Sequence, residues 1–197
     1  DGNFGGYGGG GLRLEDITGA VITGSTISNN TARSGGGIQW GAFGDSGAYP
    51  VTGAITNSTI SGNEATDNGG GISISTGDLT LNNVTISSNT AGYYGGGVIV
   101  NGDATLTLNR TIISGNTADS GDEVYVYDGI YGSGTATADN YNLFGHSGLT
   151  NNNAFTNFTP GASDITATSD GTESTGLAAI LAALADNGGP TTPATKT

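Results

Sequence analysis

The chain has 197 residues, 38 of them glycine, a formal net charge of −13, and neither cysteine nor methionine. The lack of cysteine excludes a disulfide framework and a thiolate metal site. With four lysine and arginine residues in total, the chain is poorly suited to bind nucleic acid phosphates. No apolar run approaches the ~20 residues of a membrane-spanning helix, so we expect no membrane insertion by this segment. Because it starts at Asp1, we expect a processed piece of a larger product.

Four copies of one motif follow each other along the chain, after a partial first copy at Gly9–Leu12. Each copy has a central isoleucine, an asparagine three residues later, an alanine, and then a glycine-rich bend. The isoleucines are Ile27, Ile60, Ile86 and Ile113, and the asparagines are Asn30, Asn63, Asn89 and Asn116. The asparagines are 33, 26 and 27 residues apart. A fixed period of this size is the signature of a solenoid.

Apolar residues alternate with other residues inside each copy, which predicts short strands. After the glycines the apolar pairs are Leu12/Leu14, Ile38/Trp40, Ile72/Ile74, Val98/Val100 and Val124/Val126. We expect the residues between them to face solvent, namely Arg13, Gln39, Ser73, Ile99 and Tyr125. A second apolar column is Ile22, Ile55, Leu81 and Leu108, and the isoleucines form a third. Parallel strands need a crossover, and here only further strands can supply it.

The sequence therefore predicts an all-β, right-handed parallel β-helix over residues 1–148, with three short strands per coil. Equivalent side chains should stack about 4.8 Å apart as ladders inside it. Asparagine suits a left-handed turn and can hydrogen-bond along a stack. Asp122 and Glu123 replace two glycines of the bend, which predicts a looser stack near the end. His146 falls at the expected asparagine position of a degenerate fifth copy.

Residues 149–197 lose the repeat, and we expect an irregular or helical C-terminal cap. The run 176–185 is rich in leucine and alanine and ends at Asp-Asn-Gly-Gly-Pro, which predicts a short helix. Such a helix would hide the open edge of the last coil.

The asparagine followed by Gly-Gly and a small aliphatic residue resembles the repeat of chlamydial polymorphic outer-membrane proteins. It is also similar to that of bacterial surface proteins known as right-handed parallel β-helix repeat proteins. The four isoleucines stand where that repeat usually has phenylalanine. Residues 142–145 and 181–191 are similar to the segment that closes such domains. The resemblance covers most of the chain and implies the fold and a surface location.

Three groups of residues are candidates for binding. Phe43, Asp45 and Tyr49 lie in the insertion of the 33-residue step, where solenoids often carry a binding loop. Tyr93, Tyr94 and Tyr125 are expected on the surface of the later coils, where they could hold sugar rings or a protein, or simply cover the surface. Asp119, Asp122 and Glu123 are a weak candidate for Ca²⁺, with a solvated acidic edge as the alternative. No other cofactor is expected.

We expect a non-enzymatic structural or adhesive module of a secreted or cell-surface bacterial protein. Its partners would be a protein or glycan at a surface, or further copies stacked through the coil ends into filaments. The alternative is a carbohydrate-binding or polysaccharide-degrading β-helix that uses the insertion loop or the acidic cluster. The lone His146 offers no support for nucleophilic catalysis.

Overall fold

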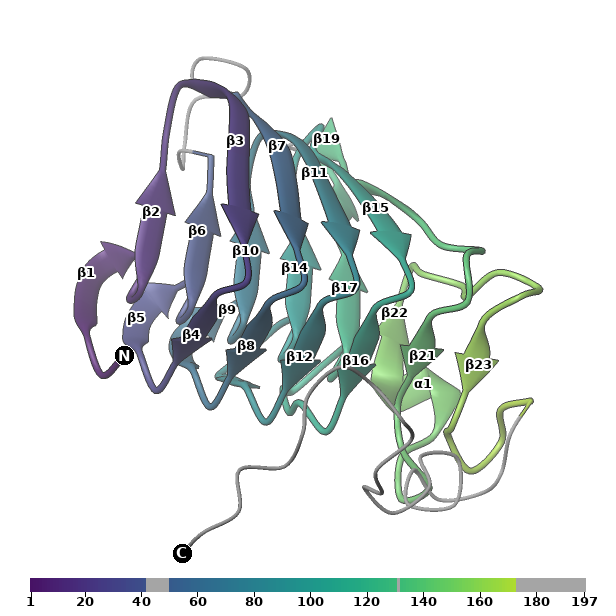
Figure 1. The fold of residues 1–197 in the computed structure, drawn as a ribbon. Coiled ribbons are helices and arrows are strands. Elements are labelled where there is room, and N and C mark those ends of the chain that lie inside the picture. Colours follow the sequence, from purple (N-terminus) through teal and green to yellow (C-terminus); the bar gives the residue numbers. More distant parts are fainter. Residues whose placement is uncertain (42–49, 131, 173–197) are drawn as a thin grey trace, which may run out of the picture.

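The structure is a computed structural model that describes residues 1–41, 50–130 and 132–172. Two predictions lie outside the described residues: the insertion loop with Phe43, Asp45 and Tyr49, and the helix expected at 176–185. Within the described part, the chain winds repeatedly around one axis and builds stacked parallel sheets (Figure 1). The predicted all-β parallel solenoid is thus confirmed.

Four parallel sheets, A to D, form the walls of the described solenoid. Sheet A contains β1 (Phe4–Gly8), β5 (Thr31–Ser34), β9 (Glu64–Asn68) and β13 (Thr90–Ala91). Sheet B contains β2 (Leu12–Leu14), β6 (Ile38–Trp40), β10 (Ile72–Ile74), β14 (Val98–Val100), β17 (Val124–Val126) and β22 (Phe155–Thr156). Sheet C contains β3 (Ile17–Thr23), β7 (Val51–Thr56), β11 (Gly77–Asn82), β15 (Thr105–Asn109) and β20 (Thr135–Thr137). Sheet D contains β4 (Thr26–Ser28), β8 (Thr59–Ser61), β12 (Thr85–Ser87), β16 (Ile112–Ser114), β21 (Leu143–Phe144) and β23 (Ile165–Thr166).

Each complete coil therefore passes through four strands, where the sequence predicted three. The additional strand follows the ladder asparagine, in the stretch that the sequence showed as a column of alanines. Ala32 pairs with Ala65, and Ala65 with Ala91, in parallel register. The local pattern is a single small residue between polar ones, too short to show an apolar alternation of its own.

The register aligns the apolar columns of the repeat. Ile27 pairs with Ile60, Ile60 with Ile86, and Ile86 with Ile113 along sheet D. From Ile60 onward these isoleucines are fully buried, as are Ile38, Ile72 and Val98 on sheet B. The core is therefore a continuous apolar column filled by stacked β-branched residues, which suit a pleated and buried surface.

A ladder of asparagines runs through the corner between sheets D and A. The side-chain oxygen of Asn63 accepts hydrogen bonds from the backbone N–H and side-chain amide of Asn30, at 3.0 and 2.9 Å. The same pair of bonds links Asn63 to Asn89 and Asn89 to Asn116. Asn3 donates to Asn30 in the same way and is the first rung. The left-handed turn belongs to the residue before each later rung, for example Asn29 at φ 57°.

The two ends of the solenoid differ. At the N-terminal end, β1, β2, β3 and β4 are each the last strand of their sheet, so one backbone edge of each is unpaired within the described structure. Exposed apolar side chains gather there, with Phe4 79% and Val21 74% exposed.

At the C-terminal end the chain folds over the last coil (Figure 1). Phe144, Phe155 and Phe158 pack edge to face with ring centroids 5.3 to 5.8 Å apart. The short helix α1 (Asn151–Ala154) carries the carbonyls that accept from Asp122 and Glu123. Sheets B and D continue beyond residue 148 through β22 and β23, and β18 (Asp128–Gly129) pairs antiparallel with β19 (Gly132–Ser133). No helix in the described ranges is long and apolar enough to span a membrane.

Candidate binding groove

The outer faces of sheets A and B meet at the glycine bend in a corner that runs along the solenoid and opens into a cavity at its N-terminal part, and we call this corner the A/B groove. Gly35, Gly69 and Gly95 open the bend with φ of 60 to 67°, a conformation that glycine adopts without strain. A Cβ atom at Gly69 would lie 2.8 Å from the Cβ of Ser73. The bend therefore brings the chain so close to sheet B that a side chain at Gly69 would collide with it.

Two columns of side chains form the walls of the groove. Sheet A and the chain that continues it contribute Tyr7, Arg33, Ser34, Asp67, Asn68, Tyr93, Tyr94 and Ser120. Sheet B contributes Arg13, Gln39, Ser73, Ile99 and Tyr125, which are register partners in that order. The walls are thus built from residues far apart in the sequence that recur once per coil.

The sheet B wall corrects the expectation that these residues face solvent. They do point away from the apolar core, but Gln39 and Ser73 are 0% exposed and Ile99 is 1% exposed. One reason is the glycine bend, which lies directly against these side chains: a Cβ at Gly95 would be 2.9 Å from the Cβ of Ile99. Outward direction and exposure are therefore different properties in this corner.

A cavity of about 460 Å³ lies in the N-terminal part of the groove. It is lined by Tyr7, Arg13, Arg33, Ser34, Asp67 and Asn68. Arg33 donates from Nε to Asp67 at 2.6 Å, and this hydrogen bond raises the pKa of the guanidinium. Arg13 donates to Glu15 on its own strand end. Two of the chain's four lysine and arginine residues therefore line one cavity, each beside a carboxylate.

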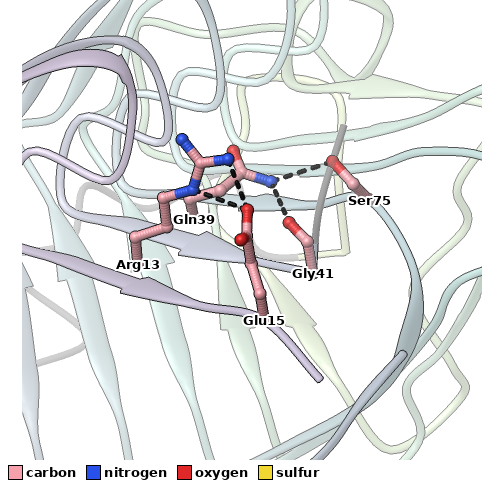
Figure 2. Close-up of polar contacts among 5 residues, drawn as sticks. All are labelled: Arg13, Glu15, Gln39, Gly41 and Ser75. Atoms are coloured by element: carbon pink, nitrogen blue, oxygen red, sulfur yellow. Dashed lines mark hydrogen bonds and ion pairs between the residues drawn. The ribbon is translucent and has the colours of Figure 1, made fainter. Parts of the chain in front are cut away.

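Buried polar atoms without partners are concentrated in this groove. Among the described residues, the buried side-chain atoms that lack a hydrogen-bond partner are Gln39 Oε1, Asn68 Oδ1 and Ser73 Oγ. All three belong to the groove walls. Figure 2 shows Gln39 beside Arg13, with its Nε2 donating to the carbonyl of Gly41 at 2.8 Å and to Ser75 Oγ at 2.9 Å. The amide nitrogen is thus satisfied while its oxygen is not, and such an atom costs about 1–3 kcal/mol when left unpaired.

Tyrosines line the C-terminal part of the groove. Tyr94 of the sheet A side and Tyr125 of sheet B have ring centroids 4.7 Å apart, so their rings meet across the groove. Tyr93 lies 6.3 Å from Tyr94 and is 55% exposed. Burial raises the pKa of Tyr125, and the neighbouring Tyr94 adds to this. The structure therefore brings the three predicted tyrosines together in one cluster.

The acidic residues Asp119, Asp122 and Glu123 do not converge on a cation site. Glu123 is 0% exposed and its Oε2 accepts from Asn116 Nδ2 at 2.6 Å, while its Oε1 accepts from the Gly115 N–H at 2.8 Å. Asp122 accepts from the Ala118 N–H, and its pKa is raised by burial. No three His, Cys, Asp or Glu side chains of the described ranges are grouped to hold a metal.

Glu123 instead ends the asparagine ladder. It occupies the position of the third glycine in the bend, where a Cβ at Gly97 would lie 3.0 Å from the rung Asn116. No asparagine of a further coil competes for that space, so the carboxyl group takes the acceptor role of the next rung. Burial raises its pKa to about 8, against the opposing effect of the hydrogen bonds from Asn116 and Gly115. The stack does not loosen here but is closed by Glu123 and α1.

His146 does not stand at the ladder position. Phe144 pairs with Ile113, which places His146 beside Gly115, one residue before the rung Asn116. Because Phe144 and not Leu143 is aligned with the ladder isoleucines, the histidine lies one residue short of the rung position. A second polar ladder crosses this region, in which Thr111 N–H donates to Asn142 and Asn142 N–H donates to Asp164, both at 2.9 Å. Asp164 thus ends the second ladder with a carboxyl group as well.

Comparison with known proteins adds no relative. No family model, no curated protein and no solved structure matches the chain.

Proposed function

We propose that the chain is a structural and adhesive module of a secreted or cell-surface bacterial protein, in which a rigid solenoid holds the A/B groove in a fixed shape. The observation that carries this proposal is the groove itself. Its walls place tyrosines, arginines and unpartnered amide oxygens at recurring positions on successive coils. Tyrosine and arginine are among the residues enriched where proteins bind their partners.

Rigidity is supported by the contacts between coils. Each coil is joined to the next by parallel backbone ladders on all sides and by the asparagine rungs in one corner. In such a stack, stability is the sum of neighbouring contacts, so the groove can extend over many coils without a larger core. A preformed groove also binds with less loss of conformational entropy than a mobile loop.

A location outside the cell is supported by the acidic surface and by the resemblance of the repeat to bacterial surface proteins. The full chain, immobilised on a sensor, should bind an isolated surface polysaccharide or an extracellular protein from a panel. Tyr94→Ala should weaken that binding, while Tyr141→Ala should not, because Tyr141 is exposed at 75% but lies outside the groove. Depolymerisation of a polysaccharide by the chain, with or without Ca²⁺, would instead make the chain an enzyme and overturn the proposal.

The unpaired N-terminal edge supports stacking on further β-structure, because exposed strand edges pair readily. At the C-terminal end α1 bonds to the last bend and three phenylalanines pack beside the last coil, so contacts between copies are proposed through the N-terminal edges, giving paired rods. Analytical ultracentrifugation of the purified chain should show a fraction of dimer that increases with protein concentration. The Val21→Lys variant should show no dimer. Monomers at every concentration would contradict this part of the proposal.

A further inference from the structure

We propose that the N-terminal cavity of the A/B groove binds a neutral oligosaccharide, with the chain of sugar rings continuing along the groove toward Tyr94 and Tyr125. This inference rests on the proposed adhesive function and names the ligand class of the same groove. It is carried by the cavity, by the unpartnered polar atoms around it, and by the aromatic rings along it.

The cavity offers donors and acceptors in the mixture that hydroxyl groups require. Arg33 uses only Nε toward Asp67, so within the described structure its two terminal NH₂ groups have no protein partner. The Oδ1 of Asn68, also on the cavity wall, is buried and unpartnered. A sugar hydroxyl both donates and accepts, so a single one can satisfy an amide oxygen and a guanidinium N–H together.

The neighbouring wall adds further unpartnered oxygens. Ser73 and Gln39 are register partners on sheet B and are both 0% exposed, yet Ser73 Oγ and Gln39 Oε1 have no partner. Both side chains lie on the outer face, because the residues on either side of each point into the core. Because both residues are closed to solvent and neither lines the cavity, these oxygens mark a polar wall next to the cavity and are not ligand contacts themselves.

Aromatic rings supply the apolar contact. Tyr7 is 75% exposed on the cavity wall, and Tyr93, Tyr94 and Tyr125 lie further along the groove. From Tyr7 to Tyr125 the groove crosses four coil steps of about 4.8 Å, or about 19 Å. This length accommodates several linked rings, with tyrosine faces for their C–H surfaces and tyrosine hydroxyls for hydrogen bonds.

The charges and the shape of the groove favour a neutral oligosaccharide over a polyanion or a folded protein. Each groove arginine already has a carboxylate beside it, Glu15 or Asp67, so the cavity has no excess of positive charge. The net charge of −13 repels polyanions such as nucleic acids and acidic polysaccharides. A folded protein needs about 800 Å² of contact on each partner for a standard interface, whereas a narrow groove suits a slender chain.

The test is isothermal titration of the full chain with cellohexaose, mannohexaose, xylohexaose and chitohexaose, and with trigalacturonic acid as the acidic probe. We expect saturable binding of at least one neutral probe. Tyr7→Ala should weaken it about threefold to tenfold, the loss of one aromatic contact. Arg33→Gln should weaken it about tenfold or more through lost charge-assisted hydrogen bonds. Tyr141→Ala is the matched control and should bind as the parent does.

The circular dichroism spectrum of each variant is compared with that of the parent, which distinguishes a loss of binding from a loss of fold. The inference is overturned if no neutral probe binds, if only trigalacturonic acid binds, or if Tyr141→Ala weakens binding as much as Tyr7→Ala. Binding of extracellular proteins without any oligosaccharide would overturn the saccharide inference while leaving the adhesive function standing. Binding of neither class would overturn both.

Discussion

Glu123→Gln should change the stability of the protein in opposite directions at low and high pH. The side chain is fully buried, and its carboxyl oxygens accept from Gly115 and Asn116. Because burial raises its pKa from 4.5 to about 8, the folded protein keeps the carboxyl group protonated in a range where the unfolded chain ionises it. The contribution of this group to stability is therefore complete below pH 4.5 and is lost as the pH rises toward 8.

The size of the effect follows from that difference in pKa. One pKa unit corresponds to about 1.4 kcal/mol, so the wild-type protein should lose up to about 5 kcal/mol between pH 4.5 and 8 from this group. Glutamine cannot ionise and keeps an oxygen for Asn116, but its NH₂ group faces the Gly115 N–H and loses that bond, at about 1 kcal/mol. Glu123→Gln should thus be slightly less stable than wild type at pH 4.5 and clearly more stable at pH 8.5.

Urea unfolding at pH 4.5, 6.5 and 8.5, followed by circular dichroism, measures this difference. Glu64→Gln is the matched control, since Glu64 is exposed on sheet A, and it should change the free energy of unfolding by less than about 0.5 kcal/mol at each pH. If the difference between Glu123→Gln and wild type were the same at all three pH values, the pKa of the carboxyl group would be the same in the folded and unfolded states. The hydrogen bonds from the ladder would then offset the effect of burial on the pKa in full, contrary to our reasoning.

Three further substitutions test the stack. Gly70→Ala should prevent folding, because the added Cβ would lie 2.5 Å from two backbone oxygens of the next coil. Gly6→Ala is the control: a Cβ at Gly6 has no neighbouring atom within 4 Å, so this variant should have the melting temperature of the wild type. Ile86→Ala should lower the free energy of unfolding by about 2–5 kcal/mol in urea titrations, and Ile130→Ala, at 88% exposure, by less than about 0.5 kcal/mol. Asn63→Ala should lower the free energy of unfolding by about 2–4 kcal/mol, because it removes the hydrogen bonds of a buried rung to both neighbouring coils. Hydrogen exchange of the backbone amides in those two coils should become faster. If the exchange rates did not change, the rungs would add little to the contact between coils.

The sequence predicted the stack well because a solenoid turns long-range contacts into a local repeat. Ile60 and Ile86 are 26 residues apart, yet their shared motif predicts that they lie side by side, as the register of β8 and β12 shows. Asn3 as the first rung was missed, because its copy of the motif is incomplete and lacks the preceding isoleucine. The signal that could have found it is its spacing of 27 residues from Asn30.

The groove could not be predicted from the alternation of residues. Ser73 stands between two core isoleucines, so the pattern correctly places it on the outer face. Whether that face meets water depends on how sharply Gly69 turns the chain and on where sheet A then lies. The backbone angle at the first glycine of each bend thus helps to decide whether the sheet B wall is buried, and the alternation of residues within the wall does not show it.

Glu123 shows how one substitution within the repeat motif can end the stack of a repeat protein. A glycine at this position is required wherever another coil follows, because any side chain would collide with the next rung, as the contacts at Gly97 show. Where no further rung follows, the same position has room, and a carboxyl group can accept the hydrogen bonds that an asparagine would have accepted. Asp164 plays the equivalent part for the second ladder. A glycine replaced by an acidic residue in the last copy of such a repeat therefore predicts the end of the hydrogen-bond ladder rather than a defect in it.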